Sequence, residues 1–324
     1  MARIPPPVAA VRTAVRRGLA DLPGDALVLV ACSGGADSLA LASAAQFVGR
    51  RVGLVTVDHG LQEGSDRRAR SVAAWARDAG FDPVRIATVS VAGLPGGPEA
   101  AARTARYDAL TTAAADLGAA AVLLGHTRDD QAETVLLALA RGAGPRGLSG
   151  MPGRRGIFRR PLLDVARADT RKACAALGLA PWEDPHNTDP AYARSRVRSA
   201  VLPVLVDALG AGVLGNLART ASLLAADNEA LDELAGAALE SARSPGGLSV
   251  RALAAQRAAI RGRVLHRWAR ELGAPGAALA FGHVVAMDAL VTDWHGQGPV
   301  HLPAGIGVAR HRDDLVRVVP AHIK

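Results

Sequence analysis

Four short apolar runs, separated by longer segments of helical periodicity, dominate the first two thirds of the chain. They cover residues 27–32, 51–57, 83–89 and 121–125 and consist largely of Val, Leu and Ala. Uninterrupted apolar runs of this length are typical of strands that are buried on both faces of a parallel sheet. The alternation of runs and helical segments predicts an α/β fold: a doubly wound parallel sheet with helices on both faces.

The pattern changes in the last third of the chain. Ala- and Leu-rich helical patterns extend to Ser241 and again from Arg251 to Leu272, and residues 300–320 alternate enough for a small β-ribbon. A chain of 324 residues is also too long for one modest core. We therefore expect two domains, a catalytic domain over residues 1–210 and a smaller, mostly helical domain over residues 211–324.

A turn rich in glycine and serine leads from the first apolar run into a helix. Its residues are Ser33, Gly34, Gly35, Ala36, Asp37 and Ser38. Without Cβ atoms, the two glycines allow a tight turn that aims successive N–H groups at one point, near the positive end of the helix. The serine hydroxyls add donors, and the aspartate can accept from loop amides or hold a phosphate-bound Mg²⁺. The turn predicts a phosphate site; the alternative is an ordinary glycine turn.

This turn has no lysine to help it bind phosphate. Lys172 and Lys324 are the only lysines in the chain, so the P-loop sequence G-x-x-x-x-G-K-[ST] is absent. The G-x-G-x-x-G dinucleotide fingerprint is also missing at this position. Backbone amides and hydroxyl groups must therefore supply the donors.

Polar residues also follow the second and the fourth predicted strands. Asp58 and His59 follow the second strand. Around the end of the fourth strand lie Gly125, His126, Asp129, Asp130 and Glu133. Open α/β sheets bind ligands at the carboxyl ends of their strands, so we expect both groups near the phosphate turn. The alternatives are an ordinary turn at His59 and a helix start capped by Thr127 and Asp130.

Arginine carries almost all of the excess positive charge, which is +8 at a pI near 10.7. Arginine matches phosphate with a planar fork of donors and stacks on bases, so a polyanionic partner is the leading interpretation. A G+C-rich genome would explain the missing lysines but explains the net excess less well. Arg103 and Arg106 share a helix face with Glu99, and could neutralise a triphosphate or pair with that acid. Residues 182–198 combine arginines with aromatic residues, which favours RNA contact over a solvated helix start.

Two cysteines, Cys32 and Cys174, cannot form a metal cluster alone and are consistent with a reducing compartment. No apolar stretch approaches membrane-spanning length, and the first ten residues lack the features of a secretory signal. We therefore expect a cytoplasmic protein without a membrane partner. The sequence does not determine the oligomeric state, and a homodimer stays open.

Four stretches together resemble the bacterial tRNA(Ile)-lysidine synthetases of the pyrophosphate-loop (N-type) ATPase superfamily. They are SGGADS, VDHGLQ, GHTRDDQAETVLLALARGAGPRGLSGM, and RPLL with the later W-E-D-x-x-N-T-D-x-x-Y-x-R segment. With the arginine helix ARTARYDAL they span roughly residues 27–205, and the combination is far more specific than the phosphate turn alone.

The resemblance implies an enzyme that uses ATP and Mg²⁺ to join free L-lysine to C2 of the wobble cytidine in the isoleucine tRNA with a CAU anticodon. C2 of cytosine is a poor electrophile, so its carbonyl oxygen would first attack the ATP α-phosphate and expel pyrophosphate. Lysine would then attack C2 of the adenylated cytidine and release AMP. Such chemistry depends on positioning and charge neutralisation.

With this resemblance, we assign residues to three tasks. Catalysis is assigned to Asp37, Arg103, His126 and Asp130, with Arg106 as an alternative to Arg103. ATP binding is assigned to Ser33, Gly34, Gly35, Ala36, Asp37, Ser38, Asp58, His59 and Gly125, with Mg²⁺ on Asp37. Binding of lysine or tRNA is assigned to Asp129, Asp130, Glu133, Arg194 and Arg196. Which of the three acids, or His126 as the alternative base, accepts the amine proton stays open.

The chain departs from the family pattern at two positions. Arg194-Ser195-Arg196 stands where the family usually has Arg-Asn-Arg, and His186 stands where a serine is common, so the contacts of this segment stay open. The chain also looks like the short form, without a further domain for the tRNA acceptor end. Three rival functions stay open: a tRNA thiolase, which would need more cysteines; an amidating ligase for a free metabolite, which would not need the arginine-rich second half; and a non-catalytic, nucleotide-dependent RNA-binding module.

Overall fold

The computed structural model describes residues 4–58, 60, 64–90, 97–184, 189–276 and 278–318, without the side chains of residues 97–100. His59, His186 and the side chain of Glu99, all named from the sequence, lie outside this description. The chain forms two compact units, residues 1–225 and 226–324, and each is described by itself. They divide inside helix α10 (Val213–Ala242), whereas the boundary predicted after residue 210 falls between α9 (Leu202–Leu209) and α10.

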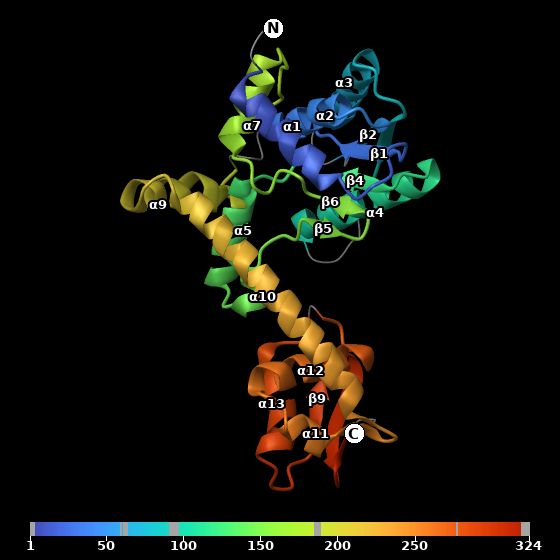
Figure 1. The fold of residues 1–324 in the computed structure, drawn as a ribbon, viewed down its shortest axis with the longest axis vertical. Helices are drawn as coiled ribbons and strands as arrows, with labels where there is room; N and C mark the ends of the chain where they lie inside the picture. The colour runs from blue at the N-terminus through green and yellow to red at the C-terminus, as the bar shows by residue number, and fades with distance from the viewer. Residues whose placement is uncertain are drawn as a thin grey trace. The chain divides into compact units, whose positions relative to one another are not determined.

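A six-stranded sheet forms the centre of the first unit (Figure 1). Its strand order is β3-β2-β1-β4-β6-β5, and every neighbouring pair is parallel except β5 with β6. The strands are β1 (Val28–Ala31), β2 (Val52–Asp58), β3 (Val84–Thr88), β4 (Ala121–Leu123), β5 (Arg154–Arg155) and β6 (Phe158–Arg159). The predicted parallel sheet is confirmed, with one short antiparallel strand at its edge.

Helices cover both faces of this sheet, which explains why its strands are uninterrupted apolar runs. Val28 and Val30 of β1 join the core formed with α1, α2 and α7, whereas Leu29 joins the opposite core formed with α4. The helices before α9 are α1 (Pro6–Gly18), α2 (Ala36–Phe47), α3 (Ser65–Asp78), α4 (Gly97–Leu117), α5 (Arg128–Ala140), α6 (Gly144–Leu148), α7 (Arg167–Ala176) and α8 (Ala193–Arg196), with a π-helical turn over Val197–Val201. The sheet is therefore doubly wound, as predicted.

The order of the strands brings two segments that are far apart in sequence to one edge of the sheet. After β1 the chain builds β2 and β3 on one side, and α4 then returns it to β4 on the other side of β1. This reversal between β1 and β4 is a topological switch point, where open α/β sheets bind ligands. Because the glycine–serine turn follows β1 and the acid-rich segment follows β4, both lie at this point.

The second unit combines helices with a five-stranded antiparallel sheet of order β7-β8-β11-β10-β9. Its elements are β7 (Arg243–Ser244), β8 (Gly247–Ser249), α11 (Val250–Ala254), α12 (Ala258–Glu271), α13 (Phe281–Thr292), β9 (Val300–Leu302), a 3₁₀ turn (Pro303–Gly305), β10 (Ile306–His311) and β11 (Asp314–Val318). The predicted β-ribbon corresponds to β9–β11. The break in the helical pattern near Pro245 is a tight hairpin whose second strand, β8, pairs with β11.

Among the described residues, no single helix is both long and apolar enough to cross a membrane. Residues 193–209 and 213–242 pass a test of length and composition only as a pair, with a bend of 100° between them.

Leu54 provides a test of the first core. Its side chain is fully buried in β2, so Leu54→Ala should lower the free energy of opening of the β1–β2 region by about 3 kcal/mol, through lost burial and a cavity. Amide hydrogen exchange of these strands measures this local stability. The matched change Leu209→Ala removes the same atoms from a side chain that is 67% exposed, and should cost under about 0.5 kcal/mol. Equal effects of the two changes would contradict this account of the core.

Candidate active site

The turn after β1 presents the first amides of α2 to a cavity. Gly34 has a φ of +85°, and a Cβ there would lie 2.9 Å from Val72 Cγ2, so the turn requires glycine. The first intrahelical bond of α2 runs from Leu39 N–H to the Gly35 carbonyl at 3.0 Å, and no side chain of the described structure caps the helix. The N–H groups of residues 36–38 therefore have no acceptor within the helix, and with the helix dipole they favour an anion.

Two serine hydroxyls hold this turn in shape. Ser38 Oγ donates to the Gly35 carbonyl at 2.9 Å, accepts from the Ser33 N–H at 3.3 Å, and lies 3.4 Å from Ser33 Oγ. Both serines also line the cavity. They are therefore placed to add hydroxyl donors to the backbone amides for a bound phosphate.

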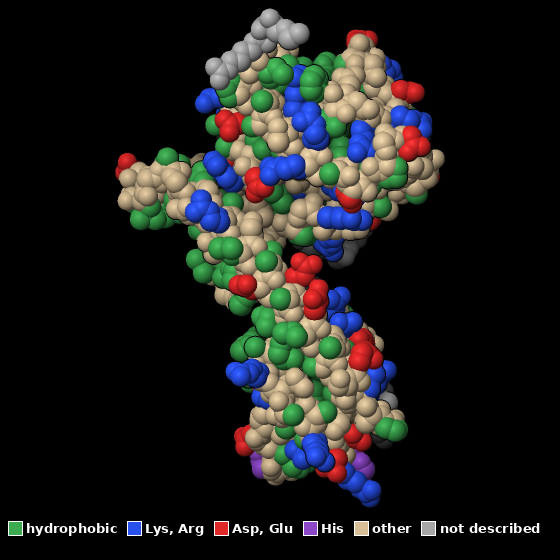
Figure 2. All heavy atoms as spheres, in the orientation of Figure 1, with side chains coloured by type: hydrophobic (Ala, Val, Ile, Leu, Met, Phe, Trp, Pro, Cys, Tyr) green, Lys and Arg blue, Asp and Glu red, His purple; other side chains and the backbone are tan. Residues whose placement is uncertain are grey.

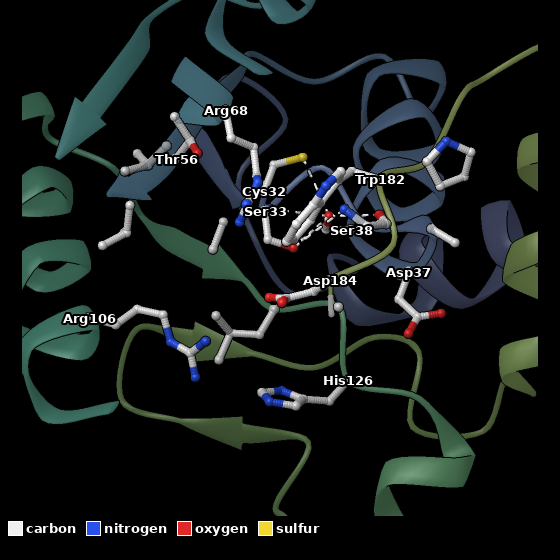
Figure 3. A pocket seen from close by; sticks show the side chains of 18 of the residues that line it. Cys32, Ser33, Asp37, Ser38, Thr56, Arg68, Arg106, His126, Trp182 and Asp184 are labelled. Atoms are coloured by element: carbon white, nitrogen blue, oxygen red, sulfur yellow. Dashed lines mark hydrogen bonds between the residues drawn. The ribbon is translucent and has the colours of Figure 1, made fainter. Parts of the chain in front are cut away.

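The cavity lies at the carboxyl ends of β1, β2 and β4 and has a volume of about 490 Å³. His126 faces the turn across this space, as Figure 3 shows. Gly125 permits the close approach of the two segments, because a Cβ there would lie only 3.2 Å from the backbone atoms of Asp37 and Ser38. The structure thus brings the predicted phosphate turn and the segment after β4 to one cavity.

Guanidinium groups from distant segments hold the acids after β4. Glu133 is fully buried, and Arg198 donates to its two oxygens at 2.8 and 3.0 Å. The side chain of Arg167 donates to Glu133 at 3.1 Å and to Asp130 at 2.6 Å, while its backbone N–H donates to Asp129 at 2.9 Å. Of these three acids, only Asp130 is among the described residues that line the cavity. Glu133 and Asp129 therefore act indirectly: Glu133 positions the side chains of Arg167 and Arg198, and Asp129 positions the backbone of Arg167.

Asp130 has both of the roles considered from the sequence: it caps helix α5 and it faces the cavity. Its Oδ2 accepts from the Thr127 N–H and hydroxyl at 2.7 and 2.8 Å, which is the capping box, while Oδ1 faces Arg167 and the cavity. Burial alone would raise the pKa of Asp130, but the charge of Arg167 and the bonds from Thr127 outweigh it and lower the pKa. Asp130 is therefore an anion at neutral pH.

Asp37 and His126 differ from Asp130 in their protonation. Burial raises the pKa of Asp37 to about 6, against the hydrogen bond from Thr170 and with the neighbouring charge of Asp130. Burial also lowers the pKa of His126 to about 3, despite the attraction of Asp130. The buried Nδ1 of His126 has no hydrogen-bond partner among the described residues. A neutral imidazole can accept a hydrogen bond there but is a weak base.

Comparisons with known proteins identify both parts of the chain. A model of the PP-loop domain matches residues 10–205, and a model of the TilS substrate binding domain matches residues 248–316. A tRNA(Ile)-lysidine synthase from Salinispora tropica is 64% identical, with 99% of each chain covered. Relatives of the same name from Thermobifida fusca and Streptomyces coelicolor are 57% and 52% identical, each with 96% of this chain and 98% of the relative covered.

The chain belongs to the tRNA(Ile)-lysidine synthase family. The family predicted from the four motifs is confirmed. Among solved structures, the U34-tRNA thiolase NcsA from Methanococcus maripaludis, with its [4Fe-4S] cluster, is similar with a TM-score of 0.56 and 18% identity, covering 67% of this chain and 80% of that chain. At this identity the likeness concerns the fold alone.

Among the cavity residues that were not named from the sequence as parts of the ATP site, two arginines stand out by their contacts. Arg167 lies just after the RPLL motif, and Arg68 lies on α3. The guanidinium of Arg68 lies over the ring of Trp182, 3.1 Å from its centroid (Figure 3). The backbone N–H of Trp182 donates to the Gly34 carbonyl at 2.9 Å. In the sequence, the three acids close together after β4 indicated that cations should lie near them in the folded protein. Nothing in the sequence indicated which arginines these were.

Several assigned residues lie beside the cavity rather than on its wall. Asp58 is buried and accepts from Ser65 Oγ at 2.6 Å and from the Gly60 N–H at 3.1 Å, so it shapes the turn after β2. Arg103 lies over the Tyr107 ring at 5.0 Å, while Arg106 lines the cavity.

The two assigned arginines of the 182–198 segment also lie off the cavity wall. Arg194 donates to Thr134 Oγ1 at 3.4 Å, and Arg196 donates to the carbonyls of Pro190 and Ala191 at 2.7 and 2.9 Å. Neither arginine is among the described residues that line the first cavity.

Asp37→Asn tests the electrostatics of the site. The pKa of Asp37 in the folded protein, about 6, lies above the ordinary value of 3.8, so the ionised carboxylate destabilises the folded protein at pH 7. The change to asparagine should therefore stabilise the protein at pH 7 by up to about 3 kcal/mol. This gain should shrink as the pH falls from 6 to 4, where the carboxylate becomes protonated in both states.

Urea unfolding between pH 4 and pH 8 measures this difference. The matched change Asp66→Asn should show no such gain, because hydrogen bonds from the backbone N–H of Arg67 and from the side chain of Arg70 lower the pKa of Asp66. A loss of stability in Asp37→Asn at pH 7, or the same pH profile in both variants, would contradict the assignment.

Proposed function

We propose that this protein uses ATP to join L-lysine to C2 of the wobble cytidine in the CAU-anticodon isoleucine tRNA, giving lysidine, AMP and pyrophosphate. One observation carries the proposal: in a chain of this family, an uncapped helix start built for phosphate and an anionic carboxylate, Asp130, line the same cavity. We place the reaction in the cytoplasm. A homodimer remains a prediction.

The phosphate side of the cavity fits ATP. The amides of residues 36–38 and the hydroxyls of Ser33 and Ser38 would bind the pyrophosphate half, and Arg106 on the opposite wall would add positive charge. No cluster of three or more metal-binding side chains exists in the described part of the chain. Mg²⁺ in nucleotide sites usually takes one or two carboxylates together with phosphates, so Asp37 fits as its ligand. The ion would neutralise charge on the phosphates.

The chemistry proceeds in two steps. The C2 carbonyl oxygen of cytidine attacks the α-phosphorus, and pyrophosphate leaves. The lysine ε-amine then attacks C2, and AMP leaves with the former carbonyl oxygen. The chain would hold both reactants in one cavity, so that the second step could follow before water intervenes.

The acid side of the cavity would handle the lysine. Asp130, anionic and held by Arg167, would orient the ε-ammonium. The ammonium must lose its proton before the amine attacks, and the charge of Arg106 on the cavity wall would favour that loss, whereas Arg167 and Arg198 are already paired with the buried acids. The proton would then leave to solvent. His126, neutral and with a free Nδ1 among the described residues, would accept a hydrogen bond from the substrate rather than remove the proton.

The rival functions have less support. The thiolase shares the fold, but this chain has only two cysteines, both buried, whereas [4Fe-4S] clusters are held by several cysteine thiolates. A ligase for a free metabolite would not require the TilS substrate binding domain matched at residues 248–316.

Transfer of labelled lysine tests the proposal. With ATP, the protein should transfer lysine to isoleucine tRNA bearing CAU but not to methionine tRNA. Asp130→Asn should lower the rate at least ~100-fold, because it removes the charge that orients the amine. The matched change Asp116→Asn breaks a surface ion pair with Arg85 and should leave the rate within about twofold. Label in both tRNAs, in neither tRNA, or an undiminished rate in Asp130→Asn would refute the proposal.

A further inference from the structure

A second cavity of about 300 Å³ lies beside the carboxyl-terminal half of α5, within the first unit. It is lined by Thr134, Leu137, Ala138, Arg141, Ala143, Ala193 and Arg194, none of which lines the first cavity. We call it the Arg141–Arg194 groove. Its lining combines an apolar floor with two guanidinium groups and one hydroxyl.

The two arginines of the groove have no acidic partner in the described part of the chain. Arg194 donates to the neutral hydroxyl of Thr134 at 3.4 Å, and the side chain of Arg141 makes no hydrogen bond or ion pair there. Several other arginines of the described chain are paired with carboxylates, as Arg263 is with Asp232 at 2.6 Å. Two cations that share a cavity without an acid repel each other and favour an anionic ligand.

The groove continues the wall of the first cavity. Helix α5 contributes Asp130 to the first cavity and Thr134 to the groove, four residues apart, which is about 6 Å along a helix. The segment packed against it contributes Arg198 to the first cavity and Arg194 to the groove, again four residues apart. Two neighbouring binding sites are thus built from successive turns of the same two segments.

We propose that the Arg141–Arg194 groove binds the nucleotide next to the reacting cytidine in the tRNA. Arg141 and Arg194 take its phosphate as planar donor forks. Leu137, Ala138, Ala143 and Ala193 contact a flat face of its base or ribose. This inference rests on the proposed function, since it requires that a cytidine of an RNA strand enters the first cavity.

Binding of a fluorescent anticodon stem-loop with a CAU loop tests the groove. Arg141→Gln and Arg194→Gln should each weaken binding roughly 3- to 10-fold and reduce the salt slope of log K by about 1 when they share in a phosphate contact. The KM values for ATP and lysine should stay unchanged. Arg77→Gln removes the same charge from the exposed end of α3, outside both cavities, and should leave affinity and slope near those of the wild type.

Two further variants separate binding from structure. Thr134→Val removes the hydrogen bond to Arg194 but no charge, so it should keep the salt slope. Arg194→Lys should keep part of the affinity, because the charge stays while the donor fork is lost. If Arg194→Gln is less stable on heating, Arg141→Gln decides the question, because the Arg141 side chain has no contact of this kind to lose among the described residues.

Unchanged RNA affinity in Arg141→Gln, or an equal loss of affinity in Arg77→Gln, would overturn the proposal that the groove binds RNA. If the wild type still forms lysidine, the proposed function would stand. A raised KM for ATP without weaker RNA binding would also overturn the proposal for the groove, since the anion would then be the nucleotide. If the wild type binds the stem-loop through the groove but forms no lysidine, the proposed function fails and the groove stands as an RNA site.

Discussion

The buried carboxylate of Glu133 is the constraint on which the site depends. Moving an ion out of water costs several kcal/mol even after relaxation, and the Glu133 side chain is 0% exposed. Arg167 and Arg198 offset this cost, and they come from segments that follow Glu133 by more than thirty residues. The charge therefore ties α5 to α7 and to the π-helical turn. Glu133 and its two arginines fix the geometry of the cavity wall more than they add stability, because the cost of burying the charges offsets much of their attraction.

This network also gives the neighbouring carboxyl groups different protonation states. Arg167 is shared by Glu133 and Asp130 and lies 3.7 Å from Asp37, so one guanidinium contacts three carboxyl groups. Burial disfavours its charge, but these carboxylates outweigh burial and raise the pKa of Arg167. Asp130 keeps its charge and Asp37 keeps a proton up to about pH 6. The two aspartates thus differ in protonation because the charge of Arg167 and the Thr127 donors outweigh burial at Asp130, whereas burial dominates at Asp37.

The fold and the phosphate turn could be predicted from local sequence, because strand burial and turn geometry each depend on a few consecutive residues. Continuous apolar runs revealed a parallel sheet, and Gly34 with its serines revealed the turn. The partners of the acids could not be predicted, because Arg167 and Arg198 meet Glu133 only through the folded topology. The excess of positive charge was also only a coarse guide to where an RNA binds. On the face shown in Figure 2, basic and acidic side chains are interspersed, and some arginines are paired within the protein, as Arg261 is with Asp288 at 2.6 Å.

The central claim is that ATP activates the RNA, in the cavity where lysine then attacks. Exchange of labelled pyrophosphate into ATP tests it most directly, because exchange requires a reversible adenylation step. We predict exchange with ATP and the CAU-anticodon isoleucine tRNA in the absence of lysine, and none with methionine tRNA. Exchange that requires lysine and proceeds without any tRNA would show that the amino acid is activated instead, and would contradict the account.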